Sequence, residues 1–272
     1  MKPEKITIIG GGNLGQAIAE GLIASNYIKA EHLTVTRRNV KLLKKLSDLG
    51  VQVSNNNLQA VEGADLIVLA IKPFQIKSIM EEIKPQLKGN QVVTSVVTGV
   101  SLNDMSEVLG EEQPVFRSMP NTAIAIRESM TCIATDNGTD EQKNMIVDLF
   151  SQLGEAIIID ESLMAAATVL GACGIAYAMR FIRAASQGGI EIGFGAQVSQ
   201  LIAAQTVKGA ASLLMETGNH PEHEIDKVTT PKGCTIAGLN EMEHQGFSSS
   251  LIKGVKTSFK AIDVIKDDFD RK

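Results

Sequence analysis

The 272-residue sequence is poor in aromatic side chains, with no tryptophan, two tyrosines and eight phenylalanines. Hydrophobic residues nevertheless make up 44% of the chain, so we expect a core of aliphatic side chains and of the ten methionines. That share, together with 21% charged residues, is typical of a globular protein. The length fits one large domain or two smaller ones.

Cysteines and histidines are few and scattered. The three cysteines, Cys132, Cys173 and Cys234, form no CxxC pair, and the four histidines follow no metal-binding spacing. No arrangement of Ser, His and Asp indicates a hydrolase. We therefore expect neither a metal nor a disulfide framework, and unpaired thiols fit a reducing cytoplasm.

The sequence also lacks a signal-peptide pattern, a long apolar run and an excess of basic residues. Its longest apolar stretch, Ala165–Met179, is about 15 residues long and interrupted by glycine, which is too short to span a bilayer. A buried helix is the better interpretation. The net charge of −5 argues against a nucleic-acid-binding protein, so we expect neither a nucleic acid nor a membrane as partner.

The first part of the chain contains short apolar segments that alternate with helical patterns. The helical patterns include Asn13–Ala24, Val40–Leu49 and Gln75–Ile83. This alternation predicts an α/β fold, a Rossmann-type doubly wound parallel sheet covered by helices on both faces. The expected strands are Ile6–Ile9, Leu33–Thr36, Leu66–Ala70, Val92–Val97, Val115–Ser118, Met130–Ala134 and Ala156–Ile159.

From residue 162 onward only helical patterns follow, so we divide the chain into a Rossmann-type domain, 1–161, and an all-helical domain, 162–272. The stretch Ala196–Met215 is apolar around much of its circumference, and a helical domain of about 110 residues offers little interior to bury it. We expect a homo-oligomer formed through this domain, the alternative being a monomer packed on the first domain. The expected helices are Ser162–Ser186, Ala196–Glu216, Glu222–Lys227, Thr235–His244 and Ser248–Lys266, before a frayed end over Lys266–Lys272.

A glycine-rich motif directly follows the first expected strand and opens the first helix. Gly10, Gly12 and Gly15 have the GxGxxG spacing, and Asn13 and Leu14 lie between the last two. In dinucleotide-binding sites these glycines allow a tight turn, a close approach of the pyrophosphate and close helix–strand packing. The motif predicts a nucleotide site, the alternative being a structural turn.

The end of the second strand indicates which nucleotide binds. Thr36, Arg37 and Arg38 stand there, and no carboxylate is present to bind the 2′-hydroxyl of NAD. Arginine pairs well with a phosphate, so we predict NADPH, with some use of NADH. The alternative is that both arginines are ordinary solvated residues.

Further polar residues follow other strands. Ala70, Lys72 and Pro73 follow one strand, and Lys72 could contact phosphate or ribose or could be a surface lysine. Val97 and Thr98 end the next strand, near the expected nicotinamide site. Residues 117–122 form a polar loop. Residues 228–239 form another, which fits either a small carboxylate or a capped turn between helices.

Several motifs together resemble the pyrroline-5-carboxylate reductase family over essentially the whole chain. Residues 228–239 read V-T-T-P-K-G-C-T-I-A-G-L, where the family has approximately V-T-S-P-G-G-T-T-I-A-G-L. Ile-Gly-x-Gly-Asn near the start, Ala-x-Lys-Pro at 70–73, Met-Pro-Asn-Thr at 119–122 and Gly-Ile-Ala-Tyr at 174–177 also match in order and spacing.

The resemblance implies reduction of the cyclic imine 1-pyrroline-5-carboxylate to L-proline, the last step of proline biosynthesis, in a dimer of interlocked helical domains. It implies that residues 229–235 bind the substrate carboxylate and that Thr235 is catalytic, its hydroxyl directed at the ring nitrogen. It also implies that Asn57 contacts the cofactor near its ribose. The implied substrate-binding residues are Thr229, Thr230, Gly233, Cys234, Thr235 and Asn121.

Departures from the family pattern leave alternatives open. Lys232 replaces a glycine, and Cys234, Ala123 and Ile175 also differ from the usual residues. Lys232 either strengthens carboxylate binding or reshapes the loop. The alternatives are a reductase of a different imine or keto substrate and a catalytically weak, regulatory NADP-binding relative. A β-hydroxyacid dehydrogenase is disfavoured because Thr168–Arg183 contains no lysine.

Overall fold

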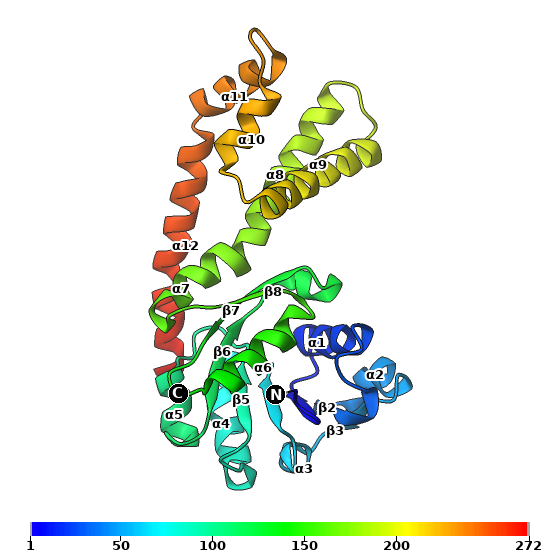
Figure 1. Ribbon diagram of the computed structural model, residues 1–272, viewed down its shortest axis with the longest axis vertical. Coiled ribbons are helices and arrows are strands. Elements are labelled where there is room, and N and C mark those ends of the chain that lie inside the picture. The colour runs from blue at the N-terminus through cyan, green and yellow to red at the C-terminus, as the bar shows by residue number, and fades with distance from the viewer. Residues whose placement is uncertain (1, 271–272) are drawn as a thin grey trace. The chain divides into compact units, whose positions relative to one another are not determined.

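The computed structural model describes residues 2–270, and it describes side chains up to Ile262. The chain divides into two compact units (Figure 1). The first contains the residues up to Cys173 together with those from Ser258 onward, and the second is Gly174–Thr257.

The first unit is built around one eight-stranded sheet in the order β3-β2-β1-β4-β5-β6-β7-β8. Neighbouring strands are parallel except β6 and β7, which are antiparallel. The central strand β1 pairs with β2 on one side and β4 on the other, so that Ile6 lies opposite both Leu33 and Leu66. The strands are β1 Ile6–Ile9, β2 Leu33–Thr36, β3 Gln52–Ser54, β4 Leu66–Leu69, β5 Val92–Ser95, β6 Val115–Met119, β7 Ser129–Ala134 and β8 Gly154–Ile158.

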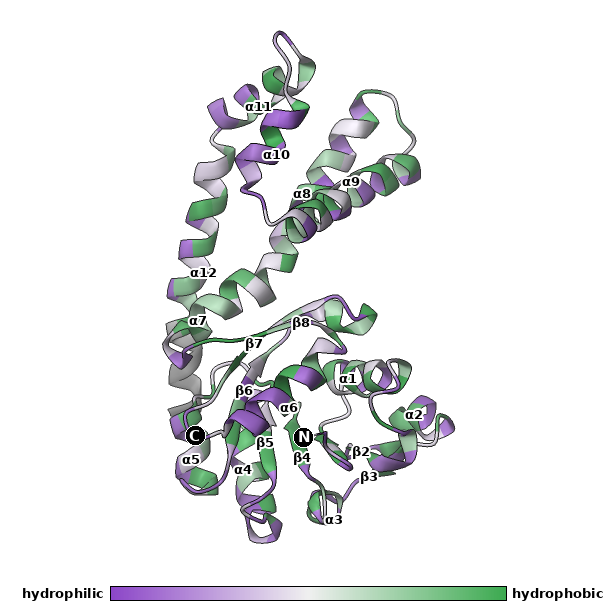
Figure 2. Ribbon diagram, viewed as in Figure 1, coloured by the Kyte–Doolittle hydropathy of each residue, from purple (hydrophilic) through white to green (hydrophobic). Residues whose placement is uncertain are grey.

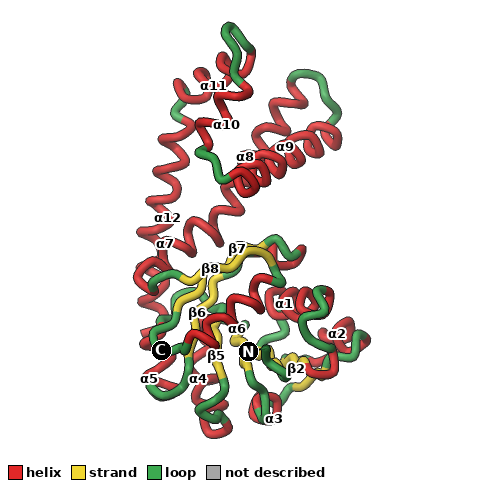
Figure 3. The backbone as a smooth tube through the Cα atoms, in the orientation of Figure 1, coloured by secondary structure: helices red, strands yellow, loops and turns green. Residues whose placement is uncertain are grey.

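Helices cover both faces of this sheet, so its central strands β1, β4 and β5 are buried at every position. Alternate side chains point to opposite faces, so Ile8 packs under α1, α2 and α6 while Ile9 packs under α3, α4, α5 and α7. Figure 3 shows the strands and the helices around them. The helices are α1 Asn13–Ala24, α2 Lys44–Asp48, α3 Asn57–Val61, α4 Pro73–Ile83, α5 Leu102–Leu109, α6 Asp140–Ser151 and α7 Met164–Ala167.

Short 3-10 helices join these elements. They are η1 Ala30–His32, η2 Val40–Leu43, η3 Lys84–Gln86, η4 Thr122–Ile126 and η5 Glu161–Leu163, and a π-helical turn, η6 Thr168–Cys173, follows α7.

The second unit consists of helices joined by loops. The helices are α8 Gly174–Glu191, α9 Ala196–Thr217, α10 Pro221–Val228, α11 Cys234–His244 and the first part of α12 Phe247–Asp270. Helices α8 and α9 cross closely, since the Oγ of Ser199 donates to the carbonyl of Ser186 over 2.7 Å and a side chain at Gly189 would meet Ser199. Among the described residues of this unit only Ser186, Ser199 and Ala203 are buried. Apolar residues such as Ile192, Leu201 and Met215 are more than 60% exposed, and Figure 2 shows the hydrophobic stretches on α8 and α9.

The predicted fold class is confirmed, with three corrections to its details. Strand β3 was not expected, because Gln52 and Ser54 make it polar, and it lies at the edge of the sheet. The sheet is not wholly parallel, because β7 runs against β6. Strand β5 ends at Ser95 rather than Val97, and α12 continues to Asp270, past the expected end at Lys266. Residues 271 and 272 lie outside the described residues.

The apolar stretch expected to be too short for a membrane belongs to a longer helix. Elements η5, α7, η6 and α8 run on as one helical stretch, Glu161–Glu191, of 31 residues. Among the described residues it is the one helix long and apolar enough to cross a membrane by length and composition, a test that core helices also pass. Only 17% of its apolar window is buried within the single chain, so the expectation of a buried helix is not met there.

Candidate active site

The glycine loop after β1 has the geometry of a phosphate cradle. Gly10 has a φ of +108°, and a side chain on it would collide with the carbonyl of Ala70. A side chain on Gly15 would collide with the carbonyl of Gly10, so glycine is needed here for α1 to start this close to the strand. Gly12, in contrast, has nothing within 4 Å of the place of a side chain. Its backbone is therefore open to a ligand at the N-terminus of α1.

A cavity of about 720 Å³ opens at this loop, at the carboxyl ends of β1, β2 and β4. Ligands of doubly wound sheets bind at such an edge. Its lining includes most residues predicted to bind the cofactor: Gly10, Gly12, Asn13, Leu14, Thr36, Arg37, Arg38, Asn57, Ala70 and Lys72. It also includes Ile9, Gly11, Asn39, Leu42, Asn55, Ile71, Gln75, Ile79 and Val96, which were not predicted.

The end of β2 supplies the charge in this cavity. Arg37 donates from Nη1 to the carbonyl of Gly11 over 2.7 Å, while Arg38 lies exposed on the same lining. The Oγ1 of Thr36 donates to Oδ1 of Asn57 over 2.7 Å. None of the described lining residues is acidic, and Lys72 adds a third positive charge. The residues thus fit a dinucleotide that carries an extra 2′-phosphate.

Four predicted cofactor residues lie outside this lining. Gly15 packs against Gly10, and Pro73 is the first residue of α4. Val97 is buried, with its N–H bonded to the Oγ of Ser95, whereas Thr98 lines a different cavity. Of the unpredicted lining residues, Asn55 lies between β3, which was not expected, and α3. Gln75 is in the first turn of α4, next to the predicted Lys72–Pro73 pair.

The predicted substrate residues 229–235 comprise the connection between α10 and α11, residues 229–233, and the first two residues of α11. Thr229 ends α10, and its Oγ1 donates to the carbonyl of Asp226 over 3.1 Å. Gly233 is the N-cap of α11, and no side chain caps this helix. Because its N–H donates to the carbonyl of Thr230 and a side chain on Gly233 would meet Thr230, the turn requires glycine there. The first N–H groups of α11 are thus available to an anion.

Thr235 and Lys232 are both exposed in this connection. Thr235 is the second residue of α11, directly after Cys234, where its hydroxyl lies beside the helix N-terminus. Lys232 has a φ of +58°, a left-handed conformation that glycine adopts without cost. The substitution of glycine by lysine noted in the sequence therefore falls on the residue whose backbone is least suited to a side chain.

Asn121, the remaining predicted substrate residue, belongs to the first unit. Its Oδ1 accepts from the N–H of Ala123 over 2.9 Å, and its Nδ2 donates to the carbonyl of Gly171 over 3.3 Å. These bonds cap η4 and tie it to η6, so the side chain has a structural role in addition to any contact with substrate. Among the described residues, no group of three or more His, Cys, Asp or Glu could hold a metal ion.

Family models match both parts of the chain. Residues 161–263 match the family described as pyrroline-5-carboxylate reductase dimerisation, and residues 5–99 match the NADP oxidoreductase, coenzyme F420-dependent family. The chain is 45% identical to pyrroline-5-carboxylate reductase 1 of Dictyostelium discoideum, over 93% of the chain but 48% of that protein, so it spans about half the length of this relative. It is 41% identical to pyrroline-5-carboxylate reductase 2 of the same organism, over 94% of the chain and 91% of that protein.

Two solved structures are similar over nearly the whole chain. The pyrroline-5-carboxylate reductase of Coxiella burnetii has a TM-score of 0.90 and 29% identity, covering 96% of this chain and 97% of that one. The crystal structure of the Plasmodium falciparum pyrroline carboxylate reductase with NADP bound has a TM-score of 0.85 and 25% identity, covering 98% and 99%.

Proposed function

The chain belongs to the pyrroline-5-carboxylate reductase family, and we propose how its residues share the work of that enzyme. The reaction is the reduction of the cyclic imine 1-pyrroline-5-carboxylate to L-proline with NADPH. The observation that carries the residue assignment is that the first unit has a cavity without acidic lining residues at its glycine loop and the second unit has a helix N-terminus that no side chain caps.

The residues of the first unit bind the cofactor. The open backbone at Gly12 and the N-terminus of α1 receive the pyrophosphate, and Arg38 pairs with the 2′-phosphate. Arg37 holds the glycine loop, and Thr36 and Asn57 form a polar edge for the ribose. When bound, the nicotinamide supplies the hydride, so the protein itself need only bind, orient and polarise the imine.

The connection between α10 and α11 binds the substrate. The N–H groups of the first turn of α11, which no side chain caps, receive the carboxylate of the imine. The hydroxyl of Thr235 donates a hydrogen bond to the ring nitrogen, which gains electron density as the C=N bond is reduced. Thr230, Gly233 and Cys234 shape the turn around the carboxylate.

The second unit forms a homo-oligomer. A dimerisation family matches residues 161–263, and the exposed apolar side chains of α8 and α9 need a partner to cover them. We propose a dimer or a multiple of dimers, in which these helices, including the apolar stretch Glu161–Glu191, are buried by the partner rather than by lipid or nucleic acid. The start of this match at residue 161 supports the division into 1–161 and 162–272.

We place the enzyme in the cytoplasm, as a member of amino-acid biosynthesis. The support is chemical: the three cysteines are all unpaired in the structure, as expected in a reducing compartment.

Turnover and product identity test the proposal. The purified protein is mixed with NADPH and 1-pyrroline-5-carboxylate, the loss of nicotinamide absorbance is followed, and L-proline is quantified in the same sample. We expect one proline for each NADPH oxidised. NADPH that binds without being oxidised by this imine would contradict the assignment of the substrate.

A further inference from the structure

An ion pair between a buried arginine and a partly exposed glutamate lies on one face of the sheet in the first unit. Arg117 is in β6 between Val115 and Met119, whose side chains pack on the same face, and its side chain is only 10% exposed. Its Nη1 donates to Oε1 of Glu161 over 2.8 Å, and its Nε is buried without a hydrogen-bond partner. Such a pair adds little net stability compared with apolar side chains, because the arginine loses most of its hydration and the glutamate, 24% exposed, loses part of its own. The pair therefore calls for a role other than stability.

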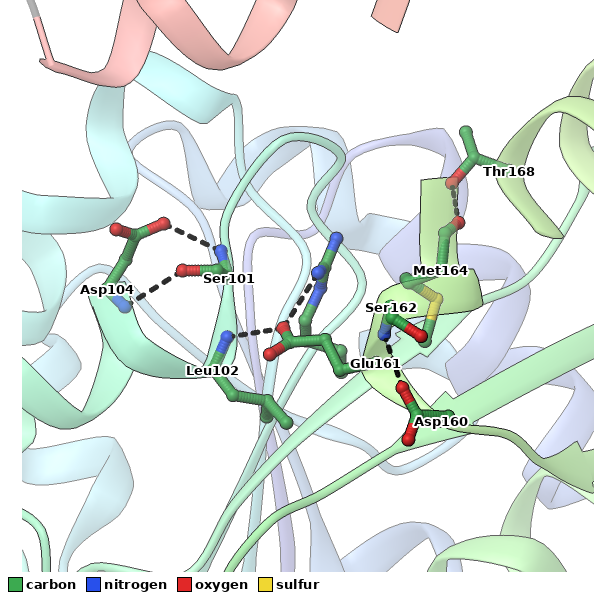
Figure 4. Close-up of polar contacts among 9 residues, drawn as sticks. Ser101, Leu102, Asp104, Asp160, Glu161, Ser162, Met164 and Thr168 are labelled. Atoms are coloured by element: carbon green, nitrogen blue, oxygen red, sulfur yellow. Dashed lines mark hydrogen bonds and ion pairs between the residues drawn. The ribbon is translucent and has the colours of Figure 1, made fainter. Parts of the chain in front are cut away.

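A second hydrogen bond of Glu161 connects the ion pair to the start of α5. The same Oε1 accepts the N–H of Leu102, the first residue of α5, over 2.7 Å (Figure 4). Ser101 and Asp104 form a capping box on the same helix end. Glu161 thus satisfies a helix N–H from 59 residues away in the sequence.

The position of Glu161 is itself fixed. Asp160 caps the short helix η5, with its Oδ1 accepting from the N–H of Ser162 over 2.8 Å. The hydrogen bonds from Ser162 lower the pKa of Asp160, so the cap stays ionised to a lower pH than an ordinary aspartate would. Arg117, Glu161 and the start of α5 therefore form one connected network on three separate elements.

This network borders the turn between β5 and α5, residues 96–101. Thr98 and Gly99 line a cavity of about 510 Å³ together with Arg117 and Glu161. The Oγ1 of Thr98 donates to the sulfur of Met119, two residues beyond Arg117, over 3.8 Å. At the other end of the turn, Val96 lines the cofactor cavity. The turn thus separates the buried network from the cofactor site.

The direction in which the cofactor lies across the sheet follows from the two phosphate positions already proposed. The pyrophosphate lies at the end of β1 and the 2′-phosphate at the end of β2. Because the sheet order is β2-β1-β4-β5, the nicotinamide half extends the other way, toward the ends of β4 and β5. It therefore reaches the turn that Glu161 anchors.

We propose that Arg117 and Glu161 are a positioning pair for the nicotinamide half of the cofactor: through Leu102 they hold residues 96–101, and through that turn the hydride donor. Neither residue touches the reacting atoms. The inference rests on the proposed function for the identity of the cofactor and for the placement of its pyrophosphate and 2′-phosphate.

Variants of the pair separate positioning from stability. Arg117→Met removes the charge at similar volume and leaves the Glu161–Leu102 bond, whereas Glu161→Ala removes both bonds. Glu161→Gln keeps an acceptor for Leu102 and Arg117 without the charge. Glu107→Ala, on the exposed side of the same helix, is the control for the loss of a carboxylate near α5.

Three quantities are measured on each variant: the dissociation constant of NADPH, the dissociation constant of adenosine 2′,5′-bisphosphate, and kcat. The bisphosphate carries the adenosine half of the cofactor but no nicotinamide. We expect Arg117→Met and Glu161→Ala to weaken NADPH binding and to lower kcat by about tenfold each, because small displacements of a reacting group are costly. Affinity for the bisphosphate should stay within about twofold of the wild type, and Glu161→Gln should recover most of the loss.

Equal weakening of NADPH and bisphosphate would overturn the proposal, since the pair would then support the whole domain. A lowered melting temperature with unchanged NADPH affinity and kcat would overturn it too. Glu161→Gln and Arg117→Lys keep the test available if the larger changes prevent folding. The binding constants need no imine, so failure of the substrate assignment would show as absent turnover with these differences in affinity intact.

Discussion

Arg37 at the end of β2 donates a hydrogen bond to the carbonyl of Gly11, so the two arginines predicted to select NADP have different surroundings. Arg37 reinforces the glycine loop, which every nicotinamide dinucleotide needs. Arg38 is exposed on the cavity lining, where a 2′-phosphate can reach it. Selectivity should therefore depend mainly on Arg38.

Replacing each arginine by alanine tests this difference in roles. Arg38→Ala should raise the KM for NADPH by roughly 10- to 100-fold, the value of a hydrogen bond to a charged group, and leave the KM for NADH nearly unchanged. Arg37→Ala should raise both, because the glycine loop loses its anchor. Initial rates measured with NADPH and with NADH give the two KM values and their ratio. An unchanged NADPH to NADH preference in Arg38→Ala would refute the role of Arg38.

Oligomer formation should depend on the exposed apolar residues of the second unit. Leu201 in α9 is 68% exposed in the single chain, and Leu201→Glu would place a charge inside the proposed interface. We expect this variant to sediment as a monomer. Ile126→Glu is the matched control, because Ile126 is 71% exposed but lies in η4 of the first unit. Sedimentation velocity that gives the same assembly for both variants would place the interface elsewhere.

Lys232 should affect stability and substrate binding in separate ways. Its φ of +58° is least favourable for β-branched residues, so Lys232→Val should lower the free energy of unfolding by about 1 to 2 kcal/mol relative to Lys232→Gly. If its ammonium assists the carboxylate, Lys232→Gly should raise the KM for 1-pyrroline-5-carboxylate by roughly threefold to tenfold without lowering kcat. With 1-pyrroline, which has no carboxylate, the KM should not change. A KM that rises equally for both imines would indicate a reshaped loop instead.

The three thiols should react in order of exposure. Cys234 is exposed at the start of α11, and Cys132 is buried in β7, where burial raises the pKa of its thiol. A raised pKa leaves less thiolate at a given pH, so Cys132 should react slowest with iodoacetamide and gain most as the pH rises. Mass spectrometry of timed samples gives the order, with Cys234→Ser identifying the first site. Labelling of Cys132 before Cys234 in the folded protein would contradict the structure.

The sequence predicted the elements that have a strong pattern. The strands at Ile6–Ile9 and Leu33–Thr36 and the helix at Asn13–Ala24 have the expected bounds, because apolar runs next to a GxGxxG motif have few alternatives. Strand β3 escaped prediction because it is only three residues long and two of the three, Gln52 and Ser54, are polar. Most of the predicted cofactor residues line one cavity, since the carboxyl ends of parallel strands meet there.

Other features depend on contacts that no local pattern records. Arg117 and Glu161 are 44 residues apart, and only the fold brings them together over the start of α5. Arg117 was expected both near the end of the strand Val115–Ser118 and at the start of a polar loop; it lies in β6, and its burial was not expected. The φ of Lys232 likewise appears only in the structure, although the resemblance to a glycine-containing family motif had marked that position. Motifs thus indicated the candidate site residues, and the fold revealed the residues that support them.

The most direct test of the account is kcat/KM for 1-pyrroline-5-carboxylate in Thr235→Ala compared with Thr217→Ala. Thr217 is an exposed threonine of the same unit, whose hydroxyl donates to the carbonyl of Leu213 within α9. The loss of a positioned donor to the ring nitrogen should lower the value for Thr235→Ala by about 100-fold or more, with Thr217→Ala close to the wild type. Equal activity of the two variants would contradict the assignment of the imine to the N-terminus of α11.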